Sequence, residues 1–101
     1  MTIDDDTLLK ARLRLPQHVV HRTFVAETVV LNLETGKYHG LNPTAGRMLD
    51  VLDCAPTVGD AAANIADEYE QDQATVTADL LTFCRDLLDR KLVEVVVAEG
   101  G

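Results

Sequence analysis

The chain has 101 residues, of which 47% are hydrophobic and 26% charged, which is the size and composition of one folded domain. Its formal net charge is −8, and no apolar run approaches the ~20 residues that a membrane-spanning helix needs. These values exclude wholesale disorder. The acidic N-terminus lacks the layout of a secretory signal, so we expect a cytoplasmic protein.

The negative charge is concentrated in the second half of the chain. Residues 1–50 carry six acids and six bases, whereas residues 51–101 carry eleven acids and three bases. Such an acidic half repels phosphate, and a basic surface is the first requirement for nucleic-acid binding. A partner of this half is therefore expected to be neutral or basic, such as a peptide.

Short apolar runs characteristic of strands occupy the chain between Arg12 and Asn42. The segments RLRL, HVVHRTFV, TVVLNL and KYHGL alternate apolar and polar residues or are rich in β-branched residues. The last two flank ETG, whose Gly36 can adopt a positive φ, and this predicts a β-hairpin. We expect one domain over residues 12–97, with flexible ends at 1–11 and 98–101.

Two registers are possible for this hairpin. A three-residue loop would pair Leu31 with His39 and would gather three aliphatic side chains on one face. That face would hold Val29, Leu31 and Leu41, and the opposite face would hold Val30, Asn32 and Tyr38. A two-residue loop would instead place Tyr38 on the face of Leu31. We prefer the three-residue loop because it groups the aliphatic residues.

From Asn42 onward the periodicity is helical. Asn42 is a suitable N-cap, and Pro43 suits the first helical position, where its missing N–H costs nothing. We predict helices over about 43–52, from Thr57 onward, and over about 74–91. The third carries two adjacent apolar stripes, one of Val76, Leu80, Phe83 and Leu87 and one of Leu81, Cys84 and Leu88. So broad a band predicts packing against two neighbours.

The predicted fold class is α+β, with an N-terminal three-stranded antiparallel sheet followed by three helices. Three helices and a small sheet make up a winged helix-turn-helix-like arrangement, here with the sheet first. The final LVEVVV could pair as a last short strand or pack as an extended end.

No catalytic or metal-binding pattern is present in the sequence. None of His18, His21 and His39 has a second ligand at metal spacing, and Cys54 and Cys84 match neither a metal site nor a disulfide framework. The chain contains no phosphate-binding loop or dinucleotide-binding motif. We therefore expect no enzyme activity, no metal and no cofactor.

Two binding functions remain. The helical half suggests a winged-helix DNA-binding regulator, but the second predicted helix carries acids and no bases, which disfavours it. If KYHGL is an edge strand, an extended peptide could instead pair with its backbone. The broad apolar band of the third helix could form the far wall of that groove, or it could only pack under the sheet.

The block G-x-Y-x-x-L-N-x-T-A supports the peptide hypothesis by resemblance. Its residues here are Gly36, Tyr38, Leu41, Asn42, Thr44 and Ala45. This block, together with TVGDAAANIADEY and RKLVEV, resembles the PqqD-like family over about residues 14–95. Members of that family are RiPP recognition elements, which bind the leader segment of a ribosomally synthesised precursor peptide. The stand-alone size resembles the recognition proteins of lasso peptide biosynthesis.

The resemblance implies where such a leader would bind. It would add as an antiparallel strand and lie in a cleft between the third hairpin strand and the third helix. On the strand this implies Lys37, Tyr38, His39, Gly40 and Leu41, and on the helix Val76, Asp79, Leu80, Phe83, Cys84 and Leu87. The implied partners are the precursor peptide, a leader peptidase and a macrocyclase, with no nucleic acid and no membrane.

Overall fold

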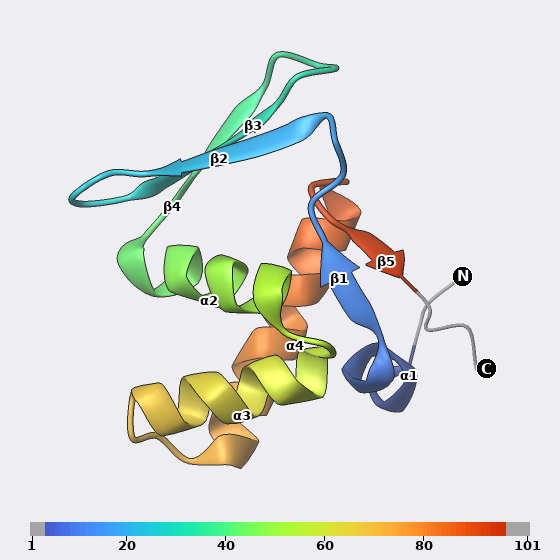
Figure 1. Cartoon of the computed structure of the whole chain (residues 1–101), viewed down its shortest axis with the longest axis vertical. Helices are drawn as coiled ribbons and strands as arrows, with labels where there is room; N and C mark the ends of the chain where they lie inside the picture. The colour runs from blue at the N-terminus through green and yellow to red at the C-terminus, as the bar shows by residue number, and fades with distance from the viewer. Residues whose placement is uncertain (1–3, 97–101) are drawn as a thin grey trace.

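A computed structural model of the protein describes residues 4–96. The elements in chain order are α1 (Asp5–Lys10), β1 (Arg12–Arg14), β2 (Val19–Thr23), β3 (Thr28–Asn32), β4 (Tyr38–Leu41), α2 (Pro43–Cys54), α3 (Val58–Glu68), α4 (Gln73–Asp89) and β5 (Glu94–Val96). The sheet β2–β3–β4 lies at one end of the molecule, and the helices form the other end (Figure 1). The predicted fold class is therefore confirmed.

Both sheets are antiparallel. The main sheet has the order β2-β3-β4, which leaves β4 at one edge, and the small second sheet pairs β1 with β5. Within the LVEVVV segment, Glu94–Val96 thus form a strand, whose partner is Arg12–Arg14. The predicted flexible C-terminus at 98–101 lies outside the described residues.

The hairpin register that we preferred from the sequence is wrong. Leu31 pairs with Tyr38 and not with His39, and the loop ends at Gly36, whose φ is +74°. The face turned toward the helices carries Thr28, Val30 and Asn32, which are 1%, 0% and 7% exposed. The criterion of grouping aliphatic side chains chose the wrong register because the buried face includes a polar residue, Asn32.

Hydrogen bonds within the loop explain how Asn32 is accommodated. Its Oδ1 atom accepts from the backbone N–H of Glu34 at 2.9 Å and of Thr35 at 3.3 Å. Its backbone C=O accepts from the N–H of Gly36 at 2.8 Å. Because a buried polar group costs little when it is hydrogen-bonded, the loop chemistry sets the register.

The predicted tail at residues 1–11 is also corrected, because α1 occupies part of it. Asp4 caps this helix by accepting from the N–H of Thr7, and Leu8 is fully buried. The C=O of Ala11 accepts from the N–H of Val58 at 2.9 Å, which ties the end of α1 to the start of α3. Leu8 thus anchors α1, a helix of six residues that is too short to show a detectable hydrophobic periodicity.

Two of the three larger helices, α2 and α3, begin at the caps expected from the sequence, whereas the cap of α4 was not predicted. Asn42 Oδ1 accepts from the N–H of Ala45 at 2.8 Å, so α2 starts directly where β4 stops. Thr57 caps α3 and Asp72 caps α4 in the same way. No helix among residues 4–96 is both long and apolar enough to cross a membrane.

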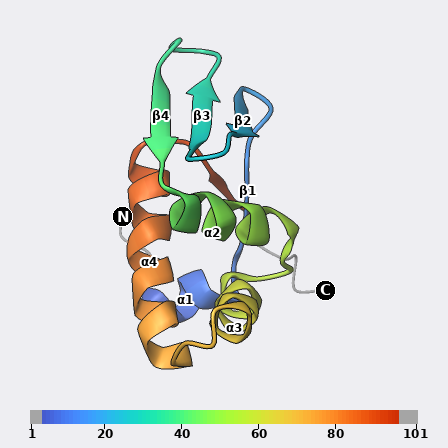
Figure 2. The same ribbon diagram turned by 90° about the vertical axis from the view of Figure 1, so that its left-hand side faces the viewer.

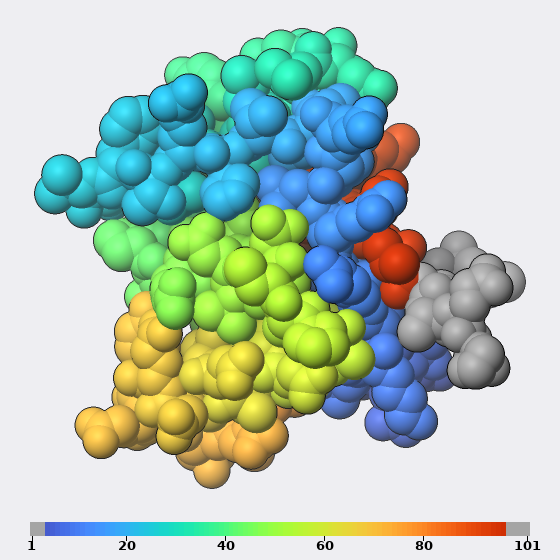
Figure 3. Space-filling model, in the orientation of Figure 1, coloured from blue at the N-terminus to red at the C-terminus, as the bar shows by residue number. Residues whose placement is uncertain are grey.

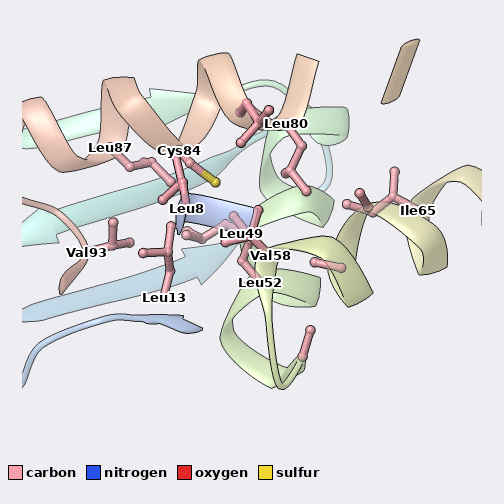
Figure 4. Packing of buried hydrophobic residues seen from close by; sticks show 14 of the residues in the cluster. Leu8, Leu13, Leu49, Leu52, Val58, Ile65, Leu80, Cys84, Leu87 and Val93 are labelled. Carbon is pink, nitrogen blue, oxygen red and sulfur yellow. The ribbon is translucent and has the colours of Figure 1, made fainter. Parts of the chain in front are cut away.

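The core lies between the helices and beneath the sheet. Leu8, Leu49, Cys84 and Leu87 come together from α1, α2 and α4 (Figure 4). Side chains fill the space between β2 and α2 in the space-filling view (Figure 3). Since α4 packs on α1 as well as on α3, the two-neighbour packing expected from its broad apolar band is found.

Candidate functional site

The free edge of β4 is the first component of the candidate site. Among the described residues, β4 pairs with β3 alone and ends the sheet (Figure 2). The C=O of Lys37 accepts from the N–H of Asn32 at 2.9 Å, so the backbone of Lys37 faces β3. Because that orientation alternates along an antiparallel strand, Tyr38 and Gly40 direct their N–H and C=O groups to the free edge.

The two faces of β4 differ. Tyr38, which is 74% exposed, and Gly40 lie on the outer face of the sheet. His39 and Leu41 are half-buried on the face toward the helices. A guanidinium group is only a donor, so Arg90 Nη1 donates to His39 Nδ1 across 3.0 Å. This bond joins β4 to the C-terminal end of α4.

The second component is the face of α4 that contains Arg90. Residues spaced by three or four positions share a helix face. On α4 this face carries Asp79, Phe83, Asp86 and Arg90. Together with Tyr38, His39, Gly40 and Leu41, these residues are here named the β4–α4 surface.

The structure divides the residues predicted from the sequence into two groups. Exposed or half-buried, and therefore available at the surface, are Lys37, Tyr38, His39, Gly40, Leu41, Asp79 and Phe83. Packed in the core, and at most 5% exposed, are Val76, Leu80, Cys84 and Leu87. The buried group supports the surface from beneath.

The sequence-based list missed Asp86 and Arg90. Arg90 Nε donates to Asp86 Oδ1 at 3.1 Å, and the same guanidinium reaches His39. Their spacing from Phe83 was visible in the sequence. However, their position beside β4 depends on how the sheet sits on α4, which no local pattern encodes.

The two cysteines differ in their surroundings, and neither belongs to a metal-binding cluster in the described part of the chain. Burial raises the pKa of the Cys84 thiol to about 12, so this residue stays protonated and unreactive at neutral pH. Cys54 is exposed. Within residues 4–96, no group of three or more His, Cys, Asp or Glu side chains is placed to hold a metal ion.

The arginines of the helical half are engaged in ion pairs, which disfavours DNA binding. Arg85 is paired with Asp5, and Arg90 with Asp86. A depression of about 610 Å³ between α2 and α3 is bordered by Arg47, which pairs with Glu68 at 2.7 Å. The hydrogen bond from Arg47 holds the pKa of the Glu68 carboxyl below its usual value.

Solved structures similar to this chain include two leader-peptide complexes. "TbiB1 in complex with the TbiA(beta) leader peptide" is 32% identical, with a TM-score of 0.73 over 80% of this chain and 94% of that chain. "Lasso peptide synthetase B1 complexed with the leader peptide" is 23% identical, with a TM-score of 0.74 over 83% of this chain and 99% of that chain. The latter identity supports the fold alone.

A third similar structure is the PqqD truncation of Methylobacterium extorquens PqqCD, described as a stand-alone RiPP recognition element. It is 27% identical, with a TM-score of 0.68 over 81% of this chain and 87% of that chain. No curated protein is similar enough in sequence to count as a match. The family model for coenzyme PQQ synthesis protein D (PqqD) matches residues 27–93, from the β2–β3 turn to the residue before β5. The chain therefore belongs to the PqqD family.

Proposed function

We propose that this protein binds the leader segment of a ribosomally synthesised precursor peptide by strand addition at β4, without catalysing a reaction itself. The observation that carries the proposal is the free edge of β4, a strand that the bond between His39 and Arg90 joins to the C-terminal end of α4. The leader peptide bound to TbiB1, which is 32% identical to this chain, supports the choice of ligand.

Backbone pairing would supply the sequence-independent part of the affinity. Tyr38 and Gly40 together offer two N–H donors and two C=O acceptors to an added strand. Each hydrogen bond contributes a net ~0.5–1.5 kcal/mol. An antiparallel partner would satisfy all four groups, which are otherwise left to water.

Side-chain pockets would supply the selectivity. Side chains alternate along a strand, so a leader residue opposite His39 would point toward α4, as would the residue opposite Leu41. There they would meet Phe83, which is half-buried against the core. Two apolar leader side chains at alternate positions are therefore the expected anchors.

A protein that binds the leader without catalysis would act by delivering the precursor peptide to enzymes. A carrier that holds the leader raises the local concentration of the attached core peptide at any enzyme that binds the carrier. For a protein of the lasso peptide type, we propose a leader peptidase and a macrocyclase as those enzymes.

Leader binding is tested by fluorescence polarisation with a fluorescently labelled leader peptide of a lasso peptide precursor. Leu41→Asp places a carboxylate on the face toward α4 and is expected to weaken binding about tenfold or more, in line with the loss of a buried apolar contact. Leu33→Asp is the matched control, because Leu33 lies in the hairpin loop and is already 57% exposed. Equal affinity of both folded variants and the parent would contradict strand addition at β4.

A further inference from the structure

The carboxylate of Glu27 lies over Gly40 on the outer face of the sheet. A Cβ atom built on Gly40 would lie only 3.0 Å from Glu27 Oε2. Glu27 directly precedes β3, and the register Thr28↔Leu41 and Val29↔Gly40 makes it the diagonal neighbour of Gly40. The absence of a side chain at Gly40 thus leaves room for an acidic group beside the free edge.

Glu27 has no cationic partner within residues 4–96. The ion pairs of this part of the chain join other residues. Arg22 lies opposite Val29 and is the diagonal neighbour of Glu27 across β2 and β3, yet no ion pair joins the two side chains. The charge of Glu27 is therefore available to a group that arrives from outside the sheet.

An added strand would bring one of its side chains to this carboxylate. The residue directly opposite Gly40 would form a hydrogen-bonded pair with it, at a Cα–Cα distance of about 5.5 Å. Its side chain would lie on the outer face, which is the face of Glu27. A lysine or arginine there could reach the carboxylate, whereas an aspartate or glutamate would be repelled.

We propose that Glu27 is a specificity-determining residue that selects a cationic side chain at the leader position opposite Gly40. The inference rests on the proposed strand addition and adds a charge preference to it. The preferred leader would carry a lysine or arginine between the two apolar residues that point toward α4. Because the pair is exposed, the expected preference is about two- to five-fold over a neutral residue.

The test is selection from a phage-displayed library of random peptides on the immobilised full chain. Peptides retained by the parent protein are expected to be enriched two- to five-fold in lysine and arginine at one position between two apolar residues. On Glu27→Lys the same position is expected to be enriched in aspartate and glutamate. On Glu27→Gln the charge preference is expected to disappear.

Asp67→Lys is the matched control, because Asp67 is an exposed residue of α3 and the change of charge is the same. Its selected peptides should keep the parental preference. Circular dichroism of each variant reports folding. The role of Glu27 would be overturned if peptides selected on Glu27→Lys kept the preference for lysine and arginine. It would also be overturned if the preference reversed on Asp67→Lys. Failure of the parent to enrich any peptide would overturn strand addition itself and this inference with it.

Discussion

A Cβ atom on Gly46 would lie 2.2 Å from the Oγ1 atom and 2.8 Å from the Cβ atom of Thr28. The backbone of α2 therefore rests directly on a side chain of β3. Thr28 is 1% exposed, and its Oγ1 lies 3.3 Å from that of Thr23, so it is held in place. This contact sets the height of the sheet above the helices, and thereby the position of β4 beside α4.

Gly46→Ala is expected to destabilise the protein. The collision is with a buried, β-branched side chain, and overpacking of this kind costs about 1–3 kcal/mol. That cost exceeds the gain of ~1 kcal/mol from replacing a helical glycine by alanine. Thermal unfolding followed by circular dichroism measures the change.

Two further variants isolate the contact. Thr44→Ala, on an exposed position of the same helix, should leave the unfolding temperature nearly unchanged. Adding Thr28→Ala to Gly46→Ala removes the oxygen that collides and should restore part of the stability, which would appear as non-additivity. A Gly46→Ala protein as stable as the parent would show that α2 does not rest on Thr28.

Local sequence signals predicted the parts of the fold that local chemistry determines. The Asn42–Pro43 pair marks the end of β4 and the start of α2, and Gly36 marks the loop, because caps and turns depend on single residues. The hairpin register could not be predicted in this way, since it depends on burying Asn32 under the sheet. In the candidate site, the strand residues were expected from the resemblance of the KYHGL segment to the PqqD-like block, and β4 does lie at a sheet edge.

The exposure of the predicted α4 residues could not be read from the sequence, for a physical reason. Val76 and Phe83 both belong to apolar stripes in the sequence, yet one is buried and the other half-buried. The direction in which each points depends on α1, which packs against α4 and whose six residues carry too short a pattern to be detected. Arg90 was missed because its partner His39 is 51 residues away.

Leu8→Ala, in the short helix α1, is expected to cost about 2–5 kcal/mol of stability. The side chain is fully buried against α4, so its loss leaves a cavity in the main core. Lys10→Ala on the exposed side of α1 is the control and should change stability by less than about 0.5 kcal/mol. Chemical denaturation measures both. Equal effects would mean that α1 does not anchor the core.

The two cysteines are expected to react differently with a thiol reagent. At pH 8 Cys54 should be alkylated rapidly, whereas Cys84 should react only on unfolding, because it is buried and its pKa is raised to about 12. Mass spectrometry of iodoacetamide-treated protein distinguishes the two sites. Rapid modification of Cys84 in the native protein would show that α4 does not seal the core as described.

The raised pKa of Cys84 also predicts how stability changes in alkali. The unfolded chain loses the thiol proton near pH 9, while the folded protein retains it up to about pH 12. Deprotonation therefore favours the unfolded state, so this contribution to stability is present below pH 9 and is lost as the pH rises above it. Cys84→Ser, which does not titrate in this range, should lack that part of the pH dependence.

Tyr38→Pro is expected to separate peptide binding from folding. Proline has no N–H, but the N–H of Tyr38 points to the free edge and makes no bond to β3, so the sheet should survive. An added strand would lose one hydrogen bond and meet the pyrrolidine ring, which should weaken leader binding about tenfold or more. His39→Pro is the opposite case, because it removes an N–H that faces β3 and should unfold the hairpin. Tyr38→Ala keeps the N–H and controls for the lost ring. If Tyr38→Pro is folded and binds the leader as well as Tyr38→Ala does, the peptide does not pair with this edge.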